Sequence, residues 1–553
     1  MSPEPGTDEL VFVPLGGAGE IGMNLNLYGC RGRWLMIDLG VTFGDDTMPG
    51  VDVVMPDPGF IEERRDRLIG LVLTHAHEDH IGAVPYLWPR LGCPIYATPF
   101  TASVLRAKFE EAGLAQAAPI TEVPLSGRIE LDPFTVELIT LTHSIPEPNA
   151  IALHTPYGTV LHTGDWKLDP DPLVGDTADE VALRALGEAG VLAMVGDSTN
   201  VFRDGVSGSE AALRESLMEL VGGASNRVAI ALFASNVARL ETIAAVAAAN
   251  GRRAALIGRA LWRMYQAAKE NGYLSKTPEF LTEHDLGRLE KHQVLLACTG
   301  SQGEPRAALS RIAADKHPNV VLEAGDMVIF SSRIIPGNEQ PIFRLHNQLA
   351  RRGVKVLTEN THFVHVSGHP ARDELVRMYQ WVRPKIAVPV HGEVRHLQAH
   401  AELARGCQVG EAVVVENGAV VRLAPGPATV TGQVPSGRLA LDGQAAIPID
   451  GPVLRDRRRI LYNGAATATV IVDHDGTLLA DPRVTLRGVL DGEAEAELLD
   501  QVVSSVRKAV EGLSAKRRRD DAELEEAVRL AVRRTVRAEL GKRPVTDVHL
   551  LRL

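Results

Sequence analysis

The sequence predicts an α/β protein of several domains: a layered α/β domain, an α/β module inserted into it, and a small C-terminal α/β domain. Residues 10–165 contain short runs of alternating polarity joined by glycine-rich turns, which is typical of strands. Residues 206–361 alternate helical segments with single strands, as in a separate α/β module. The length of 553 residues exceeds what one hydrophobic core usually supports.

Hydrophobic periodicity places the individual elements. We expect strands of the first domain at 10–14, 24–28, 33–38, 68–73, 136–139, 150–154 and 159–162. In the insert we expect helices at 238–250 and 259–270 around a strand at 254–257. Histidine-bearing, strand-like runs resume at Thr361, which indicates that the first domain closes after the insert.

These patterns predict the domain boundaries. The first domain is expected over 1–205 and 362–440, and the insert over 206–361. The segment 423–443 is rich in Gly, Pro, Ala and Ser, which indicates a linker or a sheet edge. The remainder is expected to consist of a linker at 441–455 and a C-terminal domain at 456–553, with a strand at 468–472 and helices at 498–513 and 521–540.

Composition narrows the class of protein. Hydrophobic residues make up 45% of the chain and the mean hydropathy is −0.01. No apolar run reaches the ~18 residues that span a bilayer, and residues 1–6 lack the basic and apolar regions of a signal peptide. We therefore expect a cytoplasmic protein without a membrane partner. No Cys-x-x-Cys pair occurs, so reduced packing residues are expected at Cys30, Cys93, Cys298 and Cys407.

Charge gives weaker information about partners. The net charge of −12 argues mildly against nucleic acid, because phosphate binding needs local positive charge. A local basic groove or bound dications can nevertheless act within an acidic protein. Basic runs at 457–459 and 516–519 are typical of solvated faces, with RNA contact as the alternative interpretation.

The strongest local signal is the segment 74–80, Thr-His-Ala-His-Glu-Asp-His, directly after the apolar run 68–73. Three imidazoles and two carboxylates at the end of a buried strand suit a pair of borderline metal ions. A helical zinc site fits poorly, because it needs His-Glu-x-x-His, with two histidines at i and i+4 on one helix face. A histidine-rich solvated loop is the plain alternative. We interpret the segment as half of a metallohydrolase site.

Further candidate ligands also follow expected strands. They are His143, Asp165 and His391, each of which alone would more often be a packed or exposed residue. By contrast, Gly17-Ala18-Gly19-Glu20-Ile21-Gly22 matches the dinucleotide fingerprint only weakly. A nucleotide site needs a helix to open at those glycines, yet residues 23–28 alternate like a strand. A tight glycine turn beneath the metal site is the favoured interpretation.

The order of these motifs resembles the metallo-β-lactamase superfamily, and the later motifs resemble its nucleic-acid-processing β-CASP branch, most closely the bacterial ribonuclease J family. The resemblance covers nearly the whole chain and is carried by the stretches 16–24, 48–52 and 365–369 together with the histidine cluster. It implies a metallo-β-lactamase αββα sandwich with an inserted β-CASP domain.

The resemblance also implies a ligand set and catalytic residues. One zinc would be held by His75, His77, His143 and Asp165, and a second by Asp79, His80, Asp165 and His391, with Mn²⁺ also compatible with such ligands. Asp38 would orient ligands from behind, with a turn aspartate as the alternative. His369 would contact the scissile phosphate or protonate the leaving group, and Asp197 would hold its imidazole. Structural hydrogen bonding is the alternative for both.

Substrate contacts are implied along two stretches. One is the run His365, Val366, Ser367, Gly368 and His369, and the other comprises Ser235, Asn236, Ser331, Ser332 and Arg333 of the insert, whose alternative role is ordinary capping. The chain departs from the family pattern at Ala238, where a histidine is common. It also departs at Arg333, where a small residue is common and where the guanidinium would supply a substitute cation.

By this resemblance the chain is expected to be a zinc-dependent 5′→3′ exoribonuclease that prefers 5′-monophosphate RNA, with internal cleavage left open, acting in RNA maturation and decay as a homodimer or homotetramer. Two other classes remain. A small-molecule metallohydrolase, such as a thioesterase or lactamase, would leave the insert and His369 without purpose. A non-catalytic RNA-binding scaffold would not need the intact ligand set.

Overall fold

The structure is a computed structural model that describes residues 8–45, 47–115, 118–335 and 337–553. Contacts divide the chain into two units: one runs to Thr42 and continues over Val54–Arg438, and the other comprises Phe43–Val53 and Leu439–Leu553. Residues 1–6, on which the expectation about a signal peptide rests, lie outside the described residues. Among the described helices, none is long and apolar enough to cross a membrane.

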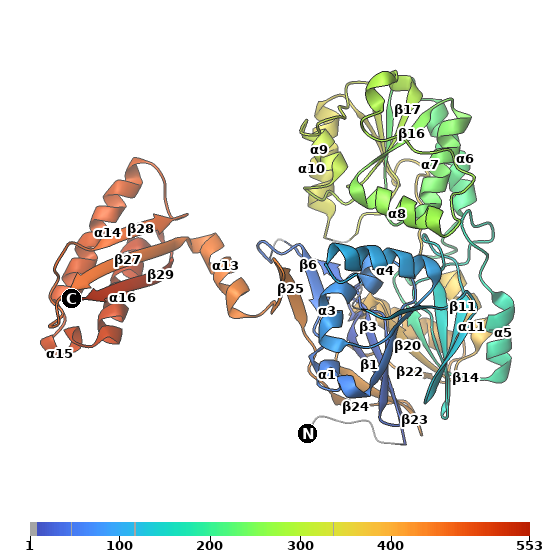
Figure 1. Ribbon diagram of the computed structural model, residues 1–553, viewed down its shortest axis with the longest axis horizontal. Coiled ribbons are helices and arrows are strands. Elements are labelled where there is room, and N and C mark those ends of the chain that lie inside the picture. The colour runs from blue at the N-terminus through green and yellow to red at the C-terminus, as the bar shows by residue number, and fades with distance from the viewer. Residues whose placement is uncertain (1–7, 46, 116–117, 336) are drawn as a thin grey trace. The chain divides into compact units, whose positions relative to one another are not determined.

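Two mixed sheets form the center of the first unit (Figure 1). The eight-stranded sheet has the order β24 (Thr429–Gln433), β23 (Ala419–Ala424), β1 (Leu10–Gly16), β3 (Leu25–Cys30), β4 (Arg33–Ile37), β7 (Leu68–Val72), β8 (Ile95–Ala97) and β9 (Ile120–Glu122). The seven-stranded sheet has the order β10 (Arg128–Leu131), β11 (Phe134–Thr140), β12 (Asn149–Thr155), β13 (Gly158–His162), β14 (Val191–Asp197), β20 (Ile386–Val390) and β22 (Glu411–Ala412).

The two sheets share one hydrophobic core. Buried side chains such as Phe12 and Tyr28 from the first sheet pack with Val136 and Val195 from the second. Helices cover the outer faces: α1 (Gly59–Glu62), α3 (Val84–Leu91) and α4 (Pro99–Glu111) lie on one side, and α5 (Glu180–Ala189), α11 (Arg372–Val382) and α12 (Val394–Gly406) lie on the other. The expected αββα sandwich is therefore confirmed.

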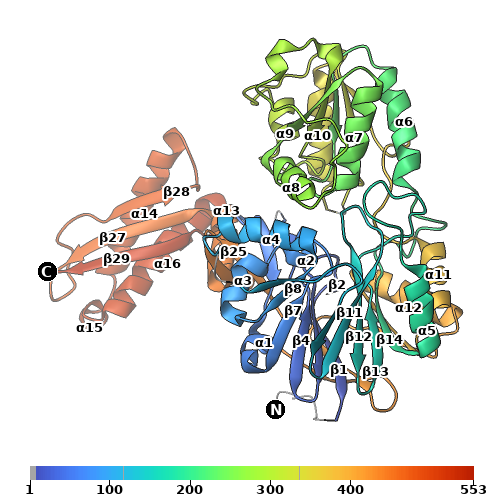
Figure 2. The same ribbon diagram turned by 45° about the vertical axis from the view of Figure 1, so that its right-hand side comes forward.

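The insert is a separate α/β layer built on a five-stranded parallel sheet (Figure 2). Its order is β16 (Arg253–Ile257), β17 (Val294–Cys298), β15 (Val228–Ala231), β18 (Met327–Phe330) and β19 (Lys355–Leu357). Central strands are buried along their whole length, as parallel strands covered on both faces must be. On one side lie α6 (Glu210–Gly222) and α7 (Val237–Ala249), on the other α9 (Ala308–Ala313) and α10 (Glu339–Arg351).

Helix α8 (Arg259–Glu270) connects the insert to the first domain by packing against α4. The guanidinium of Arg263 pairs with Glu111 at 2.6 Å. Just beyond the helix, the amide of Asn271 donates to Ser103 Oγ at 2.9 Å and the hydroxyl of Tyr273 donates to Glu147 at 3.1 Å. Helix α8 and the segment after it thus help to hold the insert on the sandwich through polar contacts to α4 and to the loop of Glu147.

The second unit contains a small sheet of β28 (Arg483–Arg487), β27 (Ala465–Val472) and β29 (Val545–Arg552). Alternate residues of β27 are buried, and they pack with α14 (Glu493–Glu511) and α16 (Asp521–Leu540) in one core. Shorter elements are the antiparallel pair β25 (Arg438–Asp442) and β26 (Ala445–Pro448), and the helices α13 (Pro452–Asn463) and α15 (Ala515–Arg518).

The segment 423–443 is mostly strand. It contains β24, which is the outermost strand of the eight-stranded sheet, and β25. The expectation of a sheet edge is confirmed, because β24 pairs with β23 at the edge of the sheet. The boundary between the two units also falls in this segment, between Arg438 and Leu439. Residues 441–455 hold β26 and the start of α13. The domain boundaries themselves remain predictions.

We expect Leu296→Ala to destabilise the insert by about 2–5 kcal/mol, because Leu296 on β17 is fully buried and its truncation leaves a cavity. Thermal and urea unfolding would measure the change. Val321→Ala, at a position that is 41% exposed on the same domain, is the matched control and should change stability little. Equal effects of the two substitutions would contradict the assigned core.

Candidate metal and RNA site

The histidine cluster lies in the turn between β7 and the short helix α2 (Glu78–Ile81). His75 and His77 precede the helix, so the turn rather than a helix face presents their rings, as the spacing predicts. The turn packs tightly on Gly40: a Cβ there would lie 1.7 Å from the carbonyl oxygen of Asp79, so only glycine fits. Backbone close packing therefore positions the cluster.

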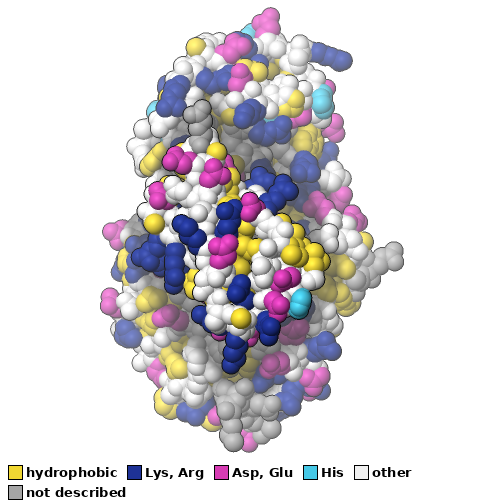
Figure 3. Space-filling model, turned by 90° about the vertical axis from the view of Figure 1, so that its left-hand side faces the viewer, with side chains coloured by type: hydrophobic (Ala, Val, Ile, Leu, Met, Phe, Trp, Pro, Cys, Tyr) yellow, Lys and Arg dark blue, Asp and Glu magenta, His cyan; other side chains and the backbone are white. Residues whose placement is uncertain are grey.

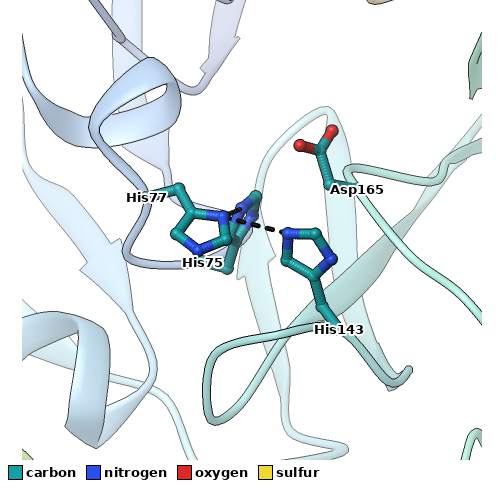
Figure 4. A group of neighbouring side chains, drawn as sticks. All are labelled: His75, His77, His143 and Asp165. Carbon is teal, nitrogen blue, oxygen red and sulfur yellow. Dashed lines mark hydrogen bonds between the residues drawn. The ribbon is translucent and has the colours of Figure 1, made fainter. Parts of the chain in front are cut away.

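The first group of ligand-type atoms comes from three imidazoles and one carboxylate, those of His75, His77, His143 and Asp165 (Figure 4). His77 Nδ1 lies 3.0 Å from His75 Nε2 and 2.9 Å from His143 Nε2. Burial is the main cause that lowers the pKa of all three rings, that of His77 to about 4. Neutral imidazoles with converging nitrogens are suited to a shared cation.

A backbone carbonyl fixes the tautomer of His143. Its Nδ1 donates to the Gly368 carbonyl at 2.5 Å, and because that oxygen can only accept, Nε2 carries the free lone pair. The approach is close, since a Cβ at Gly368 would lie 2.5 Å from His143 Cε1. The Gly368 carbonyl therefore orients the His143 ring of the first group, in addition to any contact that Gly368 makes with substrate.

The second group consists of Asp79, His80, Asp165 and His391. Asp165 Oδ2 lies 3.1 Å from His80 Nε2 and 3.4 Å from His391 Nε2, and Asp79 Oδ2 lies 3.6 Å from both. Burial would raise the pKa of Asp165, yet the nearby imidazoles hold it well below its usual value. His391 Nε2 is buried and lacks a hydrogen-bond partner among the described residues. A cation would satisfy this orphaned nitrogen.

Two polar residues support this second group from behind. Asp38, fully buried, accepts from His80 Nδ1 at 2.7 Å and from the amide and hydroxyl of Thr74 at 2.8 Å each. Its carboxylate therefore directs the lone pair of His80 Nε2 toward Asp165. Asn24 places its side-chain amide 3.2 Å from His80 Nε2 and 3.0 Å from His391 Nδ1. Sequence reasoning missed Asn24, whose one signal is its place after the glycine turn.

The glycine run 17–22 builds the site and opens no helix, so the dinucleotide alternative is wrong. Gly17, Gly19 and Gly22 all have positive φ, and β2 (Ala18–Gly19) pairs with β21 (Gly392–Glu393). The carbonyl of Gly17 accepts from the amide of His391 at 2.6 Å. The turn thereby holds His391, itself at a positive φ of 52°, in a conformation that aims its ring at Asp165.

His369 lies beside both groups and is paired with Asp197. Its Nδ1 is 2.8 Å from Asp197 Oδ2 at the end of β14 and 3.8 Å from Asp165 Oδ2. Burial pulls the pKa of His369 down, but Asp197 and Asp165 outweigh it and raise that pKa to about 9. The carboxylate fixes Nδ1–H, which leaves Nε2 to face a substrate.

The other predicted substrate residues divide into two kinds. Ser367 Oγ accepts from Asn200 Nδ2 at 2.8 Å, and Asn200 Oδ1 in turn accepts from Arg333 Nη1 at 2.8 Å. Asn200, which sequence reasoning did not select, thus connects the 365–369 run with the insert. Arg333 remains about half-exposed, so part of its guanidinium faces solvent.

The remaining ones make structural bonds. Asn236 caps α7 by accepting from the Arg239 amide at 2.8 Å, and Ser331 donates to the Val364 carbonyl at 2.6 Å while also bonding the buried guanidinium of Arg239. Ser332 and Val366 are buried, Ser235 is partly buried, and His365 Nδ1 is buried without a described partner. Their contacts with substrate stay predictions, as does the metal-binding role of the ligand set.

The two basic runs of the second unit are largely paired. Arg457 pairs with Asp442 and Arg519 with Asp475, both at 2.7 Å, and Arg517 pairs with Glu523. On the surface in Figure 3, Lys and Arg side chains stand beside Asp and Glu side chains. This pairing favours the interpretation of solvated faces over RNA contact.

Four segments of the chain match known families. Residues 27–220 match the metallo-beta-lactamase superfamily, and 225–349 match "Ribonuclease J, beta-CASP domain". Residues 353–416 match "Zn-dependent metallo-hydrolase RNA specificity domain", and 452–553 match "Ribonuclease J C-terminal domain". The matches follow the sandwich, the insert, the return to the sandwich and the C-terminal sheet.

Whole-chain relatives agree with these segments. A Ribonuclease J of Sinorhizobium meliloti is 45% identical over 99% of this chain and 98% of its own length. The chain belongs to the ribonuclease J family. Ribonuclease J of Corynebacterium glutamicum is 39% identical, covering 98% of this chain and 76% of the relative, and that of Thermus thermophilus is 36% identical, covering 91% and 89%.

A solved structure of a protein of unknown function from Enterococcus faecalis matches with a TM-score of 0.51 at 16% identity, over 75% of this chain and all of that protein, which supports the fold alone. Family membership makes the chain a metal-dependent ribonuclease, a hydrolase that uses a divalent metal and binds RNA. This activity is favoured over the small-molecule hydrolase and the non-catalytic scaffold.

We expect Asp165→Asn to lose most of its bound divalent metal, because the substitution removes the one charge that both groups share. Elemental analysis of the purified chain by mass spectrometry would measure the metal, and circular dichroism would check the fold. His154→Gln is the matched control, since His154 pairs with Glu137 on β11 and belongs to neither group. Unchanged metal content in Asp165→Asn would contradict the assignment.

Proposed function

We propose that the chain is a zinc-dependent 5′→3′ exoribonuclease that prefers RNA with a 5′ monophosphate and also cuts internally. It would act in the cytoplasm, in RNA maturation such as that of ribosomal RNA and in mRNA decay, as a homodimer or homotetramer. The observation that carries the hydrolytic part is the position of Asp165, whose carboxylate belongs to both groups of ligand-type atoms. The family description "Zn-dependent metallo-hydrolase" supports zinc.

Two ions fit the residues that would hold them. His75, His77 and His143 would hold one, Asp79, His80 and His391 the other, and Asp165 would lie between them. Two such ions, when bound, supply charge neutralisation at a phosphodiester and an acidified water. The orphaned Nε2 of His391 and the fixed tautomer of His143 support this reading of the donor set.

The remaining chemistry falls to His369 and Asp197. Asp197 accepts from Nδ1, so the opposite nitrogen of His369 would contact the scissile phosphate or deliver a proton to the departing 3′ oxygen. In-line attack at phosphorus breaks the bond to that oxygen, which needs a proton to leave as a hydroxyl. The pair would thus serve as a positioned acid next to the shared carboxylate.

The preference for a 5′ monophosphate would come from the chain of contacts between Arg333, Asn200 and Ser367. A guanidinium held by an asparagine, next to a serine hydroxyl two residues from His369, offers charge-assisted donors to a terminal phosphate. Holding the end of the strand fixes which phosphodiester meets the site, and this favours stepwise removal from the 5′ end.

We expect Asp197→Asn to lower kcat by about 10²- to 10⁴-fold, since positioned acid–base catalysis contributes a factor of this size. Metal content should be nearly unchanged, because Asp197 is bonded to His369 and lies near Asp165 and His391 only in a third group, apart from the two groups that contain His75 and Asp79. The control is His362→Asn, because His362 is hydrogen-bonded to Thr361 and lies just before the run 365–369. A kcat within twofold of the native value would remove Asp197 from the mechanism.

We expect Arg333→Ala to raise KM for 5′-monophosphate RNA about 10-fold, because one charge-assisted hydrogen bond is lost. End-labelled RNA with monophosphate, triphosphate or hydroxyl 5′ ends would be digested in parallel, and the hydroxyl form should be degraded equally by both enzymes. Arg344→Ala, at an exposed arginine of α10, is the control. If native enzyme degrades triphosphate RNA as fast as monophosphate RNA, the end-binding idea fails.

A further inference from the structure

A pocket opens in the insert at the carboxyl ends of its parallel strands. Its walls include Ser301 after β17, Ser332 after β18 and Glu359 after β19, with Phe343 and His346 of α10 opposite. Its cavity volume is about 110 Å³, below the ~300–1,000 Å³ typical of sites that enclose a whole small ligand, so the pocket suits a single ring rather than a whole nucleotide. Carboxyl ends of parallel strands are where open α/β sheets bind ligands.

The apolar part of the pocket suits a flat ring. Phe343 is 52% exposed although it lines a pocket beside Ile334 and Ile342, so one large aromatic surface is left facing solvent. Phe330 forms the floor, packed edge to face with His346 at 4.4 Å between ring centroids. RNA-binding proteins use exposed aromatic rings as stacking platforms for unpaired bases, and such stacking tolerates every base.

The polar part of the pocket suits a nucleobase rather than a phosphate. Glu359 brings a carboxylate, which repels phosphate but accepts hydrogen bonds from the amino groups of bases. Ser301 and Ser332 add hydroxyls that both donate and accept. His346 Nε2 is buried and has no hydrogen-bond partner among the described residues, so this imidazole also retains unused hydrogen-bonding capacity.

The pocket is connected to the catalytic site through Arg333. Glu359 Oε1 lies 4.0 Å from Arg333 Nε, while the other end of the same guanidinium donates to Asn200, which bonds Ser367. A strand whose phosphate meets Arg333 would therefore bring a neighbouring base to the mouth of the pocket. At this point the guanidinium of Arg333 would bind the phosphate, and the carboxylate of Glu359 would accept hydrogen bonds from the base.

We propose that this pocket binds one unpaired nucleobase of the RNA substrate, stacked on Phe343 and hydrogen-bonded by Glu359 and the two serines. The proposal rests on the proposed function for its substrate and assigns a base-binding subsite on the insert. It favours bases with amino groups over uracil, because the one N3–H donor of uracil is flanked by two carbonyl oxygens that the carboxylate of Glu359 repels.

The test compares Phe343→Ala with Phe343→Tyr in the full-length, metal-loaded enzyme, using 5′-monophosphate decamers of adenosine or uridine. We expect the alanine variant to raise KM for the adenosine decamer about 10-fold with kcat nearly unchanged, and the tyrosine variant to behave like native enzyme. Glu359→Gln should narrow the preference for adenosine over uridine. An adenosine decamer carrying one photoreactive base should crosslink to α10 in native enzyme and much less in Phe343→Ala.

Several outcomes would contradict the base-binding role of the pocket while leaving the proposed ribonuclease function intact. One is an unchanged KM in Phe343→Ala, and another is an equal loss on a decamer that has riboses but no bases. A third is saturable binding of free adenosine monophosphate at α10 while RNA kinetics stay native, which would make the pocket an effector site. Failure of the native enzyme to degrade any RNA would instead overturn the proposed function. A thermal melt of each variant checks that the insert remains folded.

Discussion

The burial of Asp165 among imidazoles is the constraint on which the rest of the structure depends. The residue is only 3% exposed, and its Oδ2 lies 3.1 Å from His80 Nε2 and 3.4 Å from His391 Nε2. The same carboxylate also belongs to the group of His75, His77 and His143. A buried charge is costly unless it is paired. The ends of strands from both sheets must therefore lie close together around this carboxylate, and the hydrophobic core that the two sheets share holds them there.

Supporting interactions are backbone contacts from distant parts of the chain. The Gly17 carbonyl holds the amide of His391, and the Gly368 carbonyl sets the tautomer of His143. In sequence, Gly17 and His143 precede the insert, whereas Gly368 and His391 follow it. The return of the chain to the sandwich after the insert therefore brings both His369 and His391 to the site. This order explains how one domain can supply the chemistry while the insert supplies the surface on which a strand of RNA would lie.

Much of this could be predicted where the signal is local. The cluster at 74–80 directly follows a clear strand, and α16 spans the residues 521–540 that its periodicity predicts. Asn24 and Asn200 could not be selected, because an isolated asparagine carries no pattern and its partners lie far away, 367 residues in the case of Asn24 and His391. The edge strand β24 could be expected only as one of two alternatives, because the Gly and Pro that flank it are equally typical of a linker.

The central proposal is that Asp165 would be a ligand of two divalent ions. Anomalous diffraction at the zinc edge from crystals of the zinc-loaded chain tests it most directly. The account predicts two peaks about 3.5–4 Å apart, as in other two-metal sites, one beside His75, His77 and His143 and one beside His80 and His391, with an oxygen of Asp165 near both. A single peak, or a second ion away from Asp165, would contradict it.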